Sequence, residues 1–418
     1  MTVQQRRRVT VVGAGIVGLA TALTLQAEGH TVTLIDPREP GTATSFGNAG
    51  AIVTGGVVPT ATPGLWRRVP NMLMDRTGPL RIRWSYLPRL APWLIRFLAA
   101  GRAERAQAIS AEIATLTGQC LEAHHRLARM ADAMAVLKPV GWLKVYRDQP
   151  AFGGTAYDRG LMDRAGVRYE VLDADALRQL EPGLSRDFTI GLFQPDASFV
   201  STPYDLSRAY LRAFLARGGA VVGEEVTGFT FEDGRPSGVV TDHGTHPVEV
   251  LVIAAGAWSR RLARQLGHPA PLDTERGYHL NLSWGDNGPV LNRPTVIGGP
   301  QFVLCPMADG IRLTAGVEFA GLDADPDFRR IRGLVPLAQQ ALPGLSGEVT
   351  REWMGFRPST PDSKPVIGPS RRHRDVYFAF GHGHMGLSLS AITGRLIADL
   401  IGGREPAVPL APFAVDRF

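Results

Sequence analysis

A run of glycines near the N-terminus has the spacing that binds the phosphates of a dinucleotide. Gly13, Gly15 and Gly18 form a G-x-G-x-x-G pattern directly after the β-branched run at 9–12. The first glycine permits a tight turn, the second lets the backbone approach a pyrophosphate, and the third lets helix and strand pack closely. The positive end of the following helix then faces the phosphates. Asp36 ends a second apolar run eighteen residues after Gly18, where its carboxylate can accept hydrogen bonds from ribose hydroxyls.

The segment after this unit is typical of a loop that encloses a ligand. Residues 42–52, TATSFGNAGAI, are small, polar and rich in glycine. Such a loop can place backbone N–H groups along a polyol chain and a flat ring, which favours a buried ligand loop over a solvent loop. Asp36 favours a free 2′-hydroxyl over a 2′-phosphate, because two negative charges would repel. Arg38 leaves two alternatives open, since it can reach a phosphate or lie on the adenosine.

A second unit of strand, glycine turn and helix occurs close to the C-terminus. The apolar run at 376–380 leads into the glycine-rich turn at 381–386, GHGHMG, and then into a helix that ends at Gly402. The helix N-terminus offers positive charge to a negative or electron-rich group, such as the pyrimidine end of a flavin. A packing turn between two tight elements is an equal alternative.

The composition fits a large globular protein that handles small molecules. The chain has 418 residues, of which 44% are hydrophobic and 20% charged, with a net charge of +6. This modest positive excess fits acidic small substrates or a membrane surface and does not argue for nucleic acid. Two cysteines without a C-x-x-C pair argue against a disulfide framework or a metal site, and favour the reducing cytoplasm. No run is long and apolar enough to span a bilayer.

The order of the elements predicts an α/β fold. Helix-strand patterns at 201–226 and 248–267 return to the style of the N-terminal unit, whereas 276–282, 302–306 and 311–315 alternate as strands of an antiparallel sheet. We therefore predict a discontinuous Rossmann-like FAD-binding domain with an inserted α+β substrate domain built on a mostly antiparallel sheet. The expected bounds are 1–60, 201–268 and 350–418 for the FAD-binding domain, and 61–200 and 269–349 for the substrate domain.

Two further segments have unusual compositions. Residues 354–368, MGFRPSTPDSKPVIG, are crowded with glycine and proline, so we expect neither a helix nor an ordinary strand but a rigid loop around Arg357. Residues 65–105 contain Trp66, Trp84 and Trp93 among many arginines, and predict a short amphipathic helix. This helix either lies in a membrane interface, on the inner face of the cytoplasmic membrane, or packs between domains with a solvated basic face.

Taken together, these motifs resemble the FAD-dependent amine oxidoreductases related to D-amino-acid oxidase and glycine oxidase, especially bacterial D-amino-acid dehydrogenases of the small-subunit type. The resemblance runs nearly end to end, and its most specific parts are GFRPSTPDSKPVIG and GHGHMGLSLS. It implies that Arg357 forms a salt bridge with the substrate carboxylate, for which a bidentate guanidinium is the best match. It makes Tyr278 either a second substrate contact or a packed strand aromatic. His384 either assists proton movement or contributes only its backbone.

The resemblance also implies where FAD is held, without a covalent bond. The loop after the second strand would lie along the ribityl chain and ring, the C-terminal turn against the pyrimidine ring, and the other segments near the adenosine and pyrophosphate. The expected cofactor-binding residues are Gly13, Gly15, Ile16, Val17, Gly18, Asp36, Pro37, Arg38, Ser45, Gly47, Asn48, Ala49, Gly50, Ala51, Ile52, Val226, Ala255, Gly256, Trp258, Gly383, His384, Met385, Gly386, Leu387 and Ser388. Cys305 is expected to be inert core.

The reaction implied is oxidation of the Cα–N bond of a free amino acid, most readily a D-amino acid. Hydride passes to flavin N5, and the imino acid hydrolyses to a 2-oxo acid and ammonia. A secondary-amine or imino-acid substrate of the hydroxyproline, proline, sarcosine or glycine type is the alternative within enzymes. A non-catalytic flavin-binding subunit is the alternative outside them, and Arg357 argues against it. The electron acceptor stays open among a quinone, a carrier and oxygen.

Overall fold

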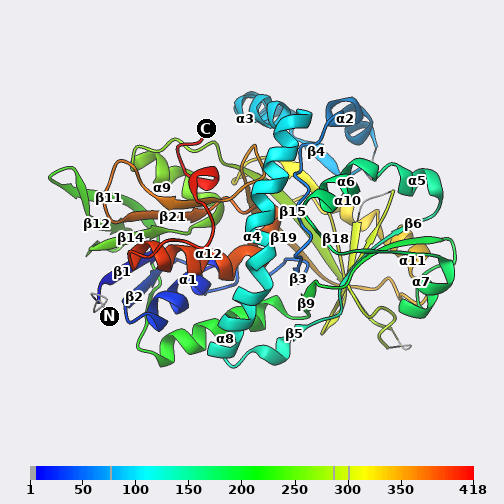
Figure 1. Cartoon of the computed structure of the whole chain (residues 1–418), viewed down its shortest axis with the longest axis horizontal. Coiled ribbons are helices and arrows are strands. Elements are labelled where there is room, and N and C mark those ends of the chain that lie inside the picture. The colour runs from blue at the N-terminus through cyan, green and yellow to red at the C-terminus, as the bar shows by residue number, and fades with distance from the viewer. Residues whose placement is uncertain (1–5, 76–77, 286–287, 300–301) are drawn as a thin grey trace.

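The computed structural model describes residues 6–75, 78–285, 288–299 and 302–418, and contains two large sheets (Figure 1). The smaller has six strands in the order β10-β2-β1-β14-β21-β20. All neighbouring pairs are parallel except β20–β21. Their bounds are β1 (Arg8–Val12), β2 (Thr31–Ile35), β10 (Ala220–Val222), β14 (Val250–Ile253), β20 (Val366–Pro369) and β21 (Val376–Phe380).

Both faces of this sheet are covered, as its short β-branched strands require. Val9 and Val11 pack in the cluster that contains the helices of one face, whereas Val12 packs with Val226 and Leu262 on the other. The first face carries α1 (Ile16–Ala27), α4 (Ala103–Met130), α8 (Pro203–Ala216) and α12 (Gly386–Ile401); the second carries α9 (Ser259–Gln265) with β11 (Val226–Glu232), β12 (Arg235–Thr241) and β13 (Thr245–Pro247). This three-layer arrangement confirms the predicted Rossmann-like unit.

The larger sheet has nine strands and is mostly antiparallel, as predicted. Its order is β19-β15-β18-β17-β16-β6-β8-β7, and β4 pairs with β18. Only the β16–β6 and β18–β4 pairs are parallel among its described strands. The bounds are β4 (Leu80–Ile82), β6 (Trp142–Tyr146), β7 (Glu170–Leu172), β8 (Ile190–Gln194), β15 (Asp273–Leu282), β16 (Thr295–Ile297), β17 (Phe302–Met307), β18 (Gly310–Phe319) and β19 (Val349–Ser359).

Strand β19 corrects the expectation of a loop around Arg357. Residues 349–359 pair with β15 along its whole length, in a register that places Arg357 opposite Glu275. Among the described strands β19 pairs only with β15, apart from a single bridge between Ser359 and His382, so it is an edge strand, and an edge strand tolerates Pro358. Residues 350–359, assigned above to the FAD-binding domain, thus pair within the larger sheet. The division of the chain into two domains stays a prediction.

The segment 65–105 forms two helices joined by a strand, at the top of the molecule in Figure 1. Helix α3 buries Leu90 and Trp93 against Phe319, so one face packs on the protein, while Ile95 and Leu98 point outward. The elements are α2 (Leu65–Met74), β4, η1 (Trp84–Tyr86) and α3 (Leu87–Ala100). Trp93 therefore belongs to the packed face, which bears out the packing alternative for this part of the helix.

The remaining elements connect the two sheets or cover the larger one. They are β3 (Ala51–Ile52), β5 (Leu137–Lys138), β9 (Ser198–Val200), α5 (Gln149–Gly153), α6 (Ala156–Arg164), α7 (Ala174–Leu180), α10 (Arg329–Arg332), α11 (Val335–Ala341), η2 (Met134–Val136), η3 (Gly256–Trp258), η4 (Gly383–Met385) and η5 (Ala411–Phe413). No helix in the described ranges is long and apolar enough to cross a membrane.

Candidate active site

A cavity of ≈ 1070 Å³ lies where the two large sheets meet. One wall comes from the glycine turns before α1 and α12, and the other from one face of the nine-stranded sheet. Neither helix has a side-chain hydrogen bond at its N-cap, although in the first turn of α1 the backbone N–H of Ile16 donates to Ser45 Oγ at 2.9 Å. The cavity therefore has two positive helix ends on one side.

The glycine fingerprint separates into residues needed for packing and one that leaves room. A Cβ on Gly13 would lie 2.4 Å from the carbonyl oxygen of Ala254, and a Cβ on Gly18 would lie 1.9 Å from that of Gly13. A Cβ on Gly15 would meet Ser45 Oγ only at 3.4 Å, an ordinary contact. The protein itself does not require glycine at 15. Its missing side chain leaves space at the cavity, as the approach of a pyrophosphate needs.

The second strand ends at the same side of the cavity. Asp36 lines it and accepts hydrogen bonds from the backbone N–H groups of Ala14 (2.8 Å) and Arg38 (3.0 Å). The Arg38 guanidinium lies over the Trp258 ring at 4.4 Å, and both side chains also line the cavity. This stacking holds the Arg38 side chain at one end of the cavity, and both alternatives for Arg38 stay open. Val226 completes this end of the wall.

Most of the expected cofactor-binding residues line this one cavity. Gly18, Gly50 and Ile52 lie behind it: Gly50 approaches the Val200 carbonyl, and Ile52 is fully buried. The residues that line it are Gly13, Gly15, Ile16, Val17, Asp36, Pro37, Arg38, Ser45, Gly47, Asn48, Ala49, Ala51, Val226, Ala255, Gly256, Trp258, Gly383, His384, Met385, Gly386, Leu387 and Ser388. Convergence of six separate segments on one space is what a long dinucleotide requires.

Arg357 projects into the cavity from β19 and crosses over its neighbours. Its guanidinium lies above Gly277, where a Cβ would be 2.3 Å from Cζ, and donates to the carbonyl oxygen of Gly316 at 2.9 Å. Among the described residues it has no carboxylate within ion-pair distance and no other hydrogen bond. Burial lowers the pKa of Arg357, and Glu275 opposes that shift. The side chain is thus a held guanidinium whose remaining donors face the cavity.

Beside it, a buried carboxylate is paired with a histidine. Glu275 is 2% exposed, and its Oε2 lies 2.6 Å from Nε2 of His384. Burial raises the pKa of Glu275, but the charge and hydrogen bond of His384 and the charge of Arg357 outweigh it, so the pKa lies below its ordinary value. Glu275 therefore stays ionised, with His384 and Arg357 around it. His384 also lines the cavity, so its side chain and its backbone are both placed at the site.

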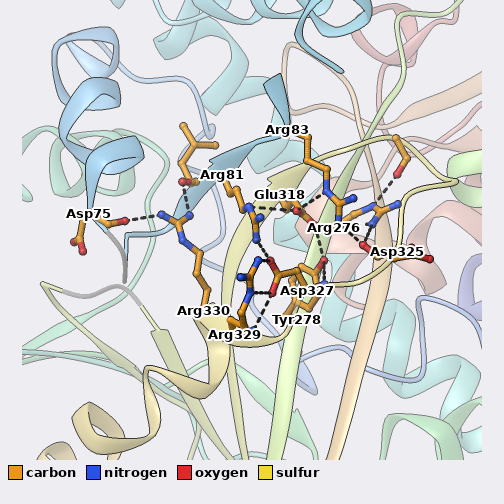
Figure 2. Close-up of polar contacts among 12 residues, drawn as sticks. Asp75, Arg81, Arg83, Arg276, Tyr278, Glu318, Asp325, Asp327, Arg329 and Arg330 are labelled. Carbon is orange, nitrogen blue, oxygen red and sulfur yellow. Dashed lines mark hydrogen bonds and ion pairs between the residues drawn. The ribbon is translucent and has the colours of Figure 1, made fainter. Parts of the chain in front are cut away.

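Tyr278 lies on the opposite face of β15 and does not line this cavity. Its hydroxyl donates to Glu318, and its ring packs edge-on against Phe328 at 5.4 Å. Figure 2 shows the polar cluster to which this pair belongs, in which Arg81 and Arg83 of the 65–105 segment reach Glu318. In this position Tyr278 is a packed strand aromatic and does not face the cavity in which a substrate would bind.

The structure adds residues that the sequence analysis did not select. Glu275 comes one residue before the segment 276–282, in which the alternation of a strand was recognised. If that alternation is extended by one residue, Glu275 lies on the same face as Gly277, which is the face that lines the cavity. Lys144 and Asp158 also line the cavity, from β6 and α6. No local signal pointed to them. In the described residues no cluster of three or more metal-ligating side chains is found. Cys305 is fully buried, as expected.

These features fit FAD. The positive N-terminus of α1 and the space at Gly15 suit a pyrophosphate, and Asp36 suits ribose hydroxyls. The N-terminus of α12 suits a group that gains negative charge on reduction. Gly383 to Ser388 would hold the ring, and Glu275 lies against that turn through its contact with His384, with Arg357 beside it.

Comparisons with known proteins agree with FAD as the cofactor. A family model described as FAD dependent oxidoreductase matches residues 8–400. A D-amino-acid oxidase from Bradyrhizobium diazoefficiens is 38% identical over 99% of this chain and 99% of its own. D-amino acid dehydrogenase 2 from Ralstonia nicotianae is 32% identical over 98% of this chain and 100% of its own. Two solved structures share the fold at low identity. Glycine oxidase from Bacillus cereus has a TM-score of 0.72 and 20% identity, over 98% of this chain and 99% of that one. L-proline dehydrogenase from P. horikoshii has a TM-score of 0.76 and 18% identity, over 100% of this chain and 98% of that one.

Proposed function

Because the chain belongs to the family of FAD-dependent oxidoreductases, we propose that it oxidises the Cα–N bond of a free amino acid, with a D-amino acid as the preferred substrate. The single observation that supports this most is Arg357. It is a half-buried guanidinium with one hydrogen bond to the described residues, and it lines the cavity. A planar guanidinium with free donors matches a carboxylate in geometry and charge.

The residues of the chain bind and orient the substrate. Arg357 takes the substrate carboxylate, and the close packing over Gly277 and Gly316 fixes the angle at which it does so. FAD, when bound, supplies the acceptor for the hydride that leaves Cα. Positioning of this kind contributes much of the rate in such reactions.

The Glu275–His384 pair accepts the proton that the ammonium group of the substrate must lose. The amino group must be neutral to drive hydride transfer, so the ammonium form has to lose a proton first. When its imidazole is neutral, His384 donates Nε2–H to Glu275, and Nδ1 can then accept that proton to give the imidazolium whose charge lowers the pKa of Glu275. Glu275 then stabilises the imidazolium. The imino acid that results takes up water and gives a 2-oxo acid and ammonia.

The preference for a D-amino acid rests on the relatives in sequence, which are named D-amino-acid oxidase and D-amino acid dehydrogenase. Anaerobic mixing of the holoenzyme with a panel of D- and L-amino acids and secondary amines such as D-proline and sarcosine tests it. We expect bleaching of the flavin absorbance by D-amino acids with free amino groups. Faster bleaching by secondary amines or L-amino acids would reassign the substrate. No bleaching by any member would end the amino-acid proposal.

The surface beside the cavity supports a proposal for the electron acceptor. Large apolar side chains are exposed on α2, η1 and α3, and exposed arginines lie among them. Trp66 is 61% exposed and Leu98 is 48% exposed, yet both also line the cavity. The exposed surface and the cavity therefore share residues. This supports peripheral contact with an anionic membrane and transfer of electrons to a membrane quinone.

Liposome binding tests the membrane contact. We expect the holoenzyme to sediment with anionic vesicles and to be released by salt, and Trp84→Ser with Ile95→Ser to weaken both binding and quinone reduction. The two side chains are each 70% exposed. Leu215→Ser is the matched control, because Leu215 is 47% exposed on α8, away from this surface. Unchanged binding in the double variant would exclude the contact, and oxygen would become the acceptor to test.

A further inference from the structure

The nine-stranded sheet carries a second polar group on its cavity face, away from Arg357. Lys144 on β6 lines the cavity together with Asp158 on α6 and Gln194 on β8. The strand register pairs Gln194 with Trp142. Trp142 is two residues before Lys144 on β6, so the two side chains lie on the same face of that strand. Three elements therefore bring a cation, an anion and a carboxamide to one part of the wall.

None of these three groups is satisfied by the protein. Lys144 and Asp158 make no hydrogen bond or ion pair with any described residue. Gln194 is 2% exposed; its Oε1 has no partner, and its Nε2 makes only a 4.0 Å contact with the sulfur of Met162. Burial lowers the pKa of Lys144 and raises that of Asp158, while each charge opposes the shift in the other. Polar groups left unpaired in this way are costly unless a ligand binds them.

The position of this group relative to Arg357 suits the far end of a substrate side chain. The hydrogen bond to Gly316 holds the Arg357 guanidinium over β18. Residues paired across the sheet lead from Thr314 on β18, through β17 and β16, to Lys144 on β6. Three strand spacings are about 14 Å. The lysine stem shortens that gap from one side, and the bound α-carboxylate shortens it from the other. A side chain of several bonds is needed to bridge the rest.

The pairing of opposite charges decides the chemistry of that end. A carboxylate would gain from Lys144 but face Asp158, and an ammonium would gain from Asp158 but face Lys144. A group with both a donor and an acceptor satisfies both charges at once, and it can also pair with the amide of Gln194. We propose that Lys144, Asp158 and Gln194 form a subsite for the carboxamide or ureido end of an amino-acid side chain.

The inference rests on the proposed function, and a panel of isosteric substrates tests the two separately. The rate constants kcat/KM for flavin reduction are measured with D-glutamine, D-glutamate and D-methionine, and with D-citrulline and D-arginine. We expect the amide or ureido member of at least one set to exceed its isosteres by about tenfold, the effect of one hydrogen bond to a charged group. A higher value for D-glutamate or D-arginine, or no difference within both sets, overturns the inference while the proposed function stands. No reduction by any member overturns both.

Two variants connect the preference to the subsite. Lys144→Met and Asp158→Asn are each expected to lower kcat/KM for the preferred amide or ureido substrate by about tenfold more than for D-methionine. Lys138→Met is the control, since Lys138 is exposed on β5. If both variants lower all substrates equally, or neither changes the preference, the subsite assignment is wrong.

Discussion

Replacing Arg357 with methionine tests the carboxylate clamp with little change in side-chain volume. The guanidinium now donates one hydrogen bond, to Gly316, which leaves two parallel donors for a carboxylate. Hydrogen bonds to charged groups contribute about 1.5–3 kcal/mol each. Two of them give about 3–6 kcal/mol, and about 1.4 kcal/mol corresponds to a factor of ten. We therefore expect Arg357→Met to weaken substrate binding about 10²- to 10⁴-fold, with a smaller loss in Arg357→Lys, which keeps the charge but not the fork.

Stopped-flow reduction under anaerobic conditions separates binding from chemistry. The substrate dependence of the reduction rate gives the dissociation constant, and its plateau gives the rate of hydride transfer. The loss should appear mainly in the dissociation constant, and in the affinity for a carboxylate inhibitor such as benzoate. Arg351→Met is the control, because Arg351 is exposed on the same strand. A dissociation constant for Arg357→Met within about threefold of that for Arg351→Met would refute the clamp, since it is less than one hydrogen bond.

Three other changes have directions that follow from the structure. Gly15→Ala should lower FAD affinity but keep the melting temperature of the apoprotein, whereas Gly18→Ala should lower that temperature, because its Cβ would lie 1.9 Å from a carbonyl oxygen; equal effects would contradict the division of roles. Glu318→Gln should lower the free energy of unfolding, measured with a chemical denaturant, by about 3–5 kcal/mol, because it leaves a buried arginine without its ion-pair partner. Glu352→Gln, which breaks a surface ion pair, should lower it by less than about 1 kcal/mol. Similar losses in the two variants would argue that the cluster around Glu318 does not stabilise the 65–105 segment. Acidification should also destabilise the protein, because three buried histidines have pKa values lowered by burial to about 3 or 4, so near pH 5 only the unfolded chain binds these protons. Stability is then full above about pH 6.5 and falls by about 4 kcal/mol per pH unit near pH 5, and equal unfolding free energies at about pH 7 and pH 5 would contradict this. The histidines are His124, His279 and His382.

The parts of the fold that were predictable are those set by neighbouring residues. The β1–α1–β2 unit and the β21–α12 unit follow from glycine spacing, apolar runs and helical periodicity, all within about thirty residues. Strand β19 was missed because Gly355 and Pro358 read locally as a loop, while its pairing with β15 joins residues 67 or more positions apart. An edge position resolves the conflict, and an edge position is a property of the sheet, not of the segment.

The site divides in the same way. The loops that line the cavity share compositions that a sequence can show, and the arginine in GFRP was recognised from a resemblance. The alternation of side chains along β15 predicts that Tyr278 and Glu275 lie on opposite faces of the strand. Only the packing of the protein shows which of these faces lines the cavity. Lys144 and Asp158 come together from a strand and a helix that have no common motif. Convergence of that kind depends on long-range pairing, which no local pattern records.

In the proposed mechanism, Glu275 links recognition of the substrate to the removal of its proton. Two partners, His384 and Arg357, keep this carboxylate ionised in spite of its burial. When a substrate carboxylate takes the free donors of Arg357, part of that guanidinium's charge is neutralised, and Glu275 depends more strongly on a positive His384. Binding therefore favours transfer of the ammonium proton to His384 Nδ1 at the stage where the neutral amine is needed. On this view Arg357 affects the acid–base step as well as affinity, because one buried carboxylate lies between the two.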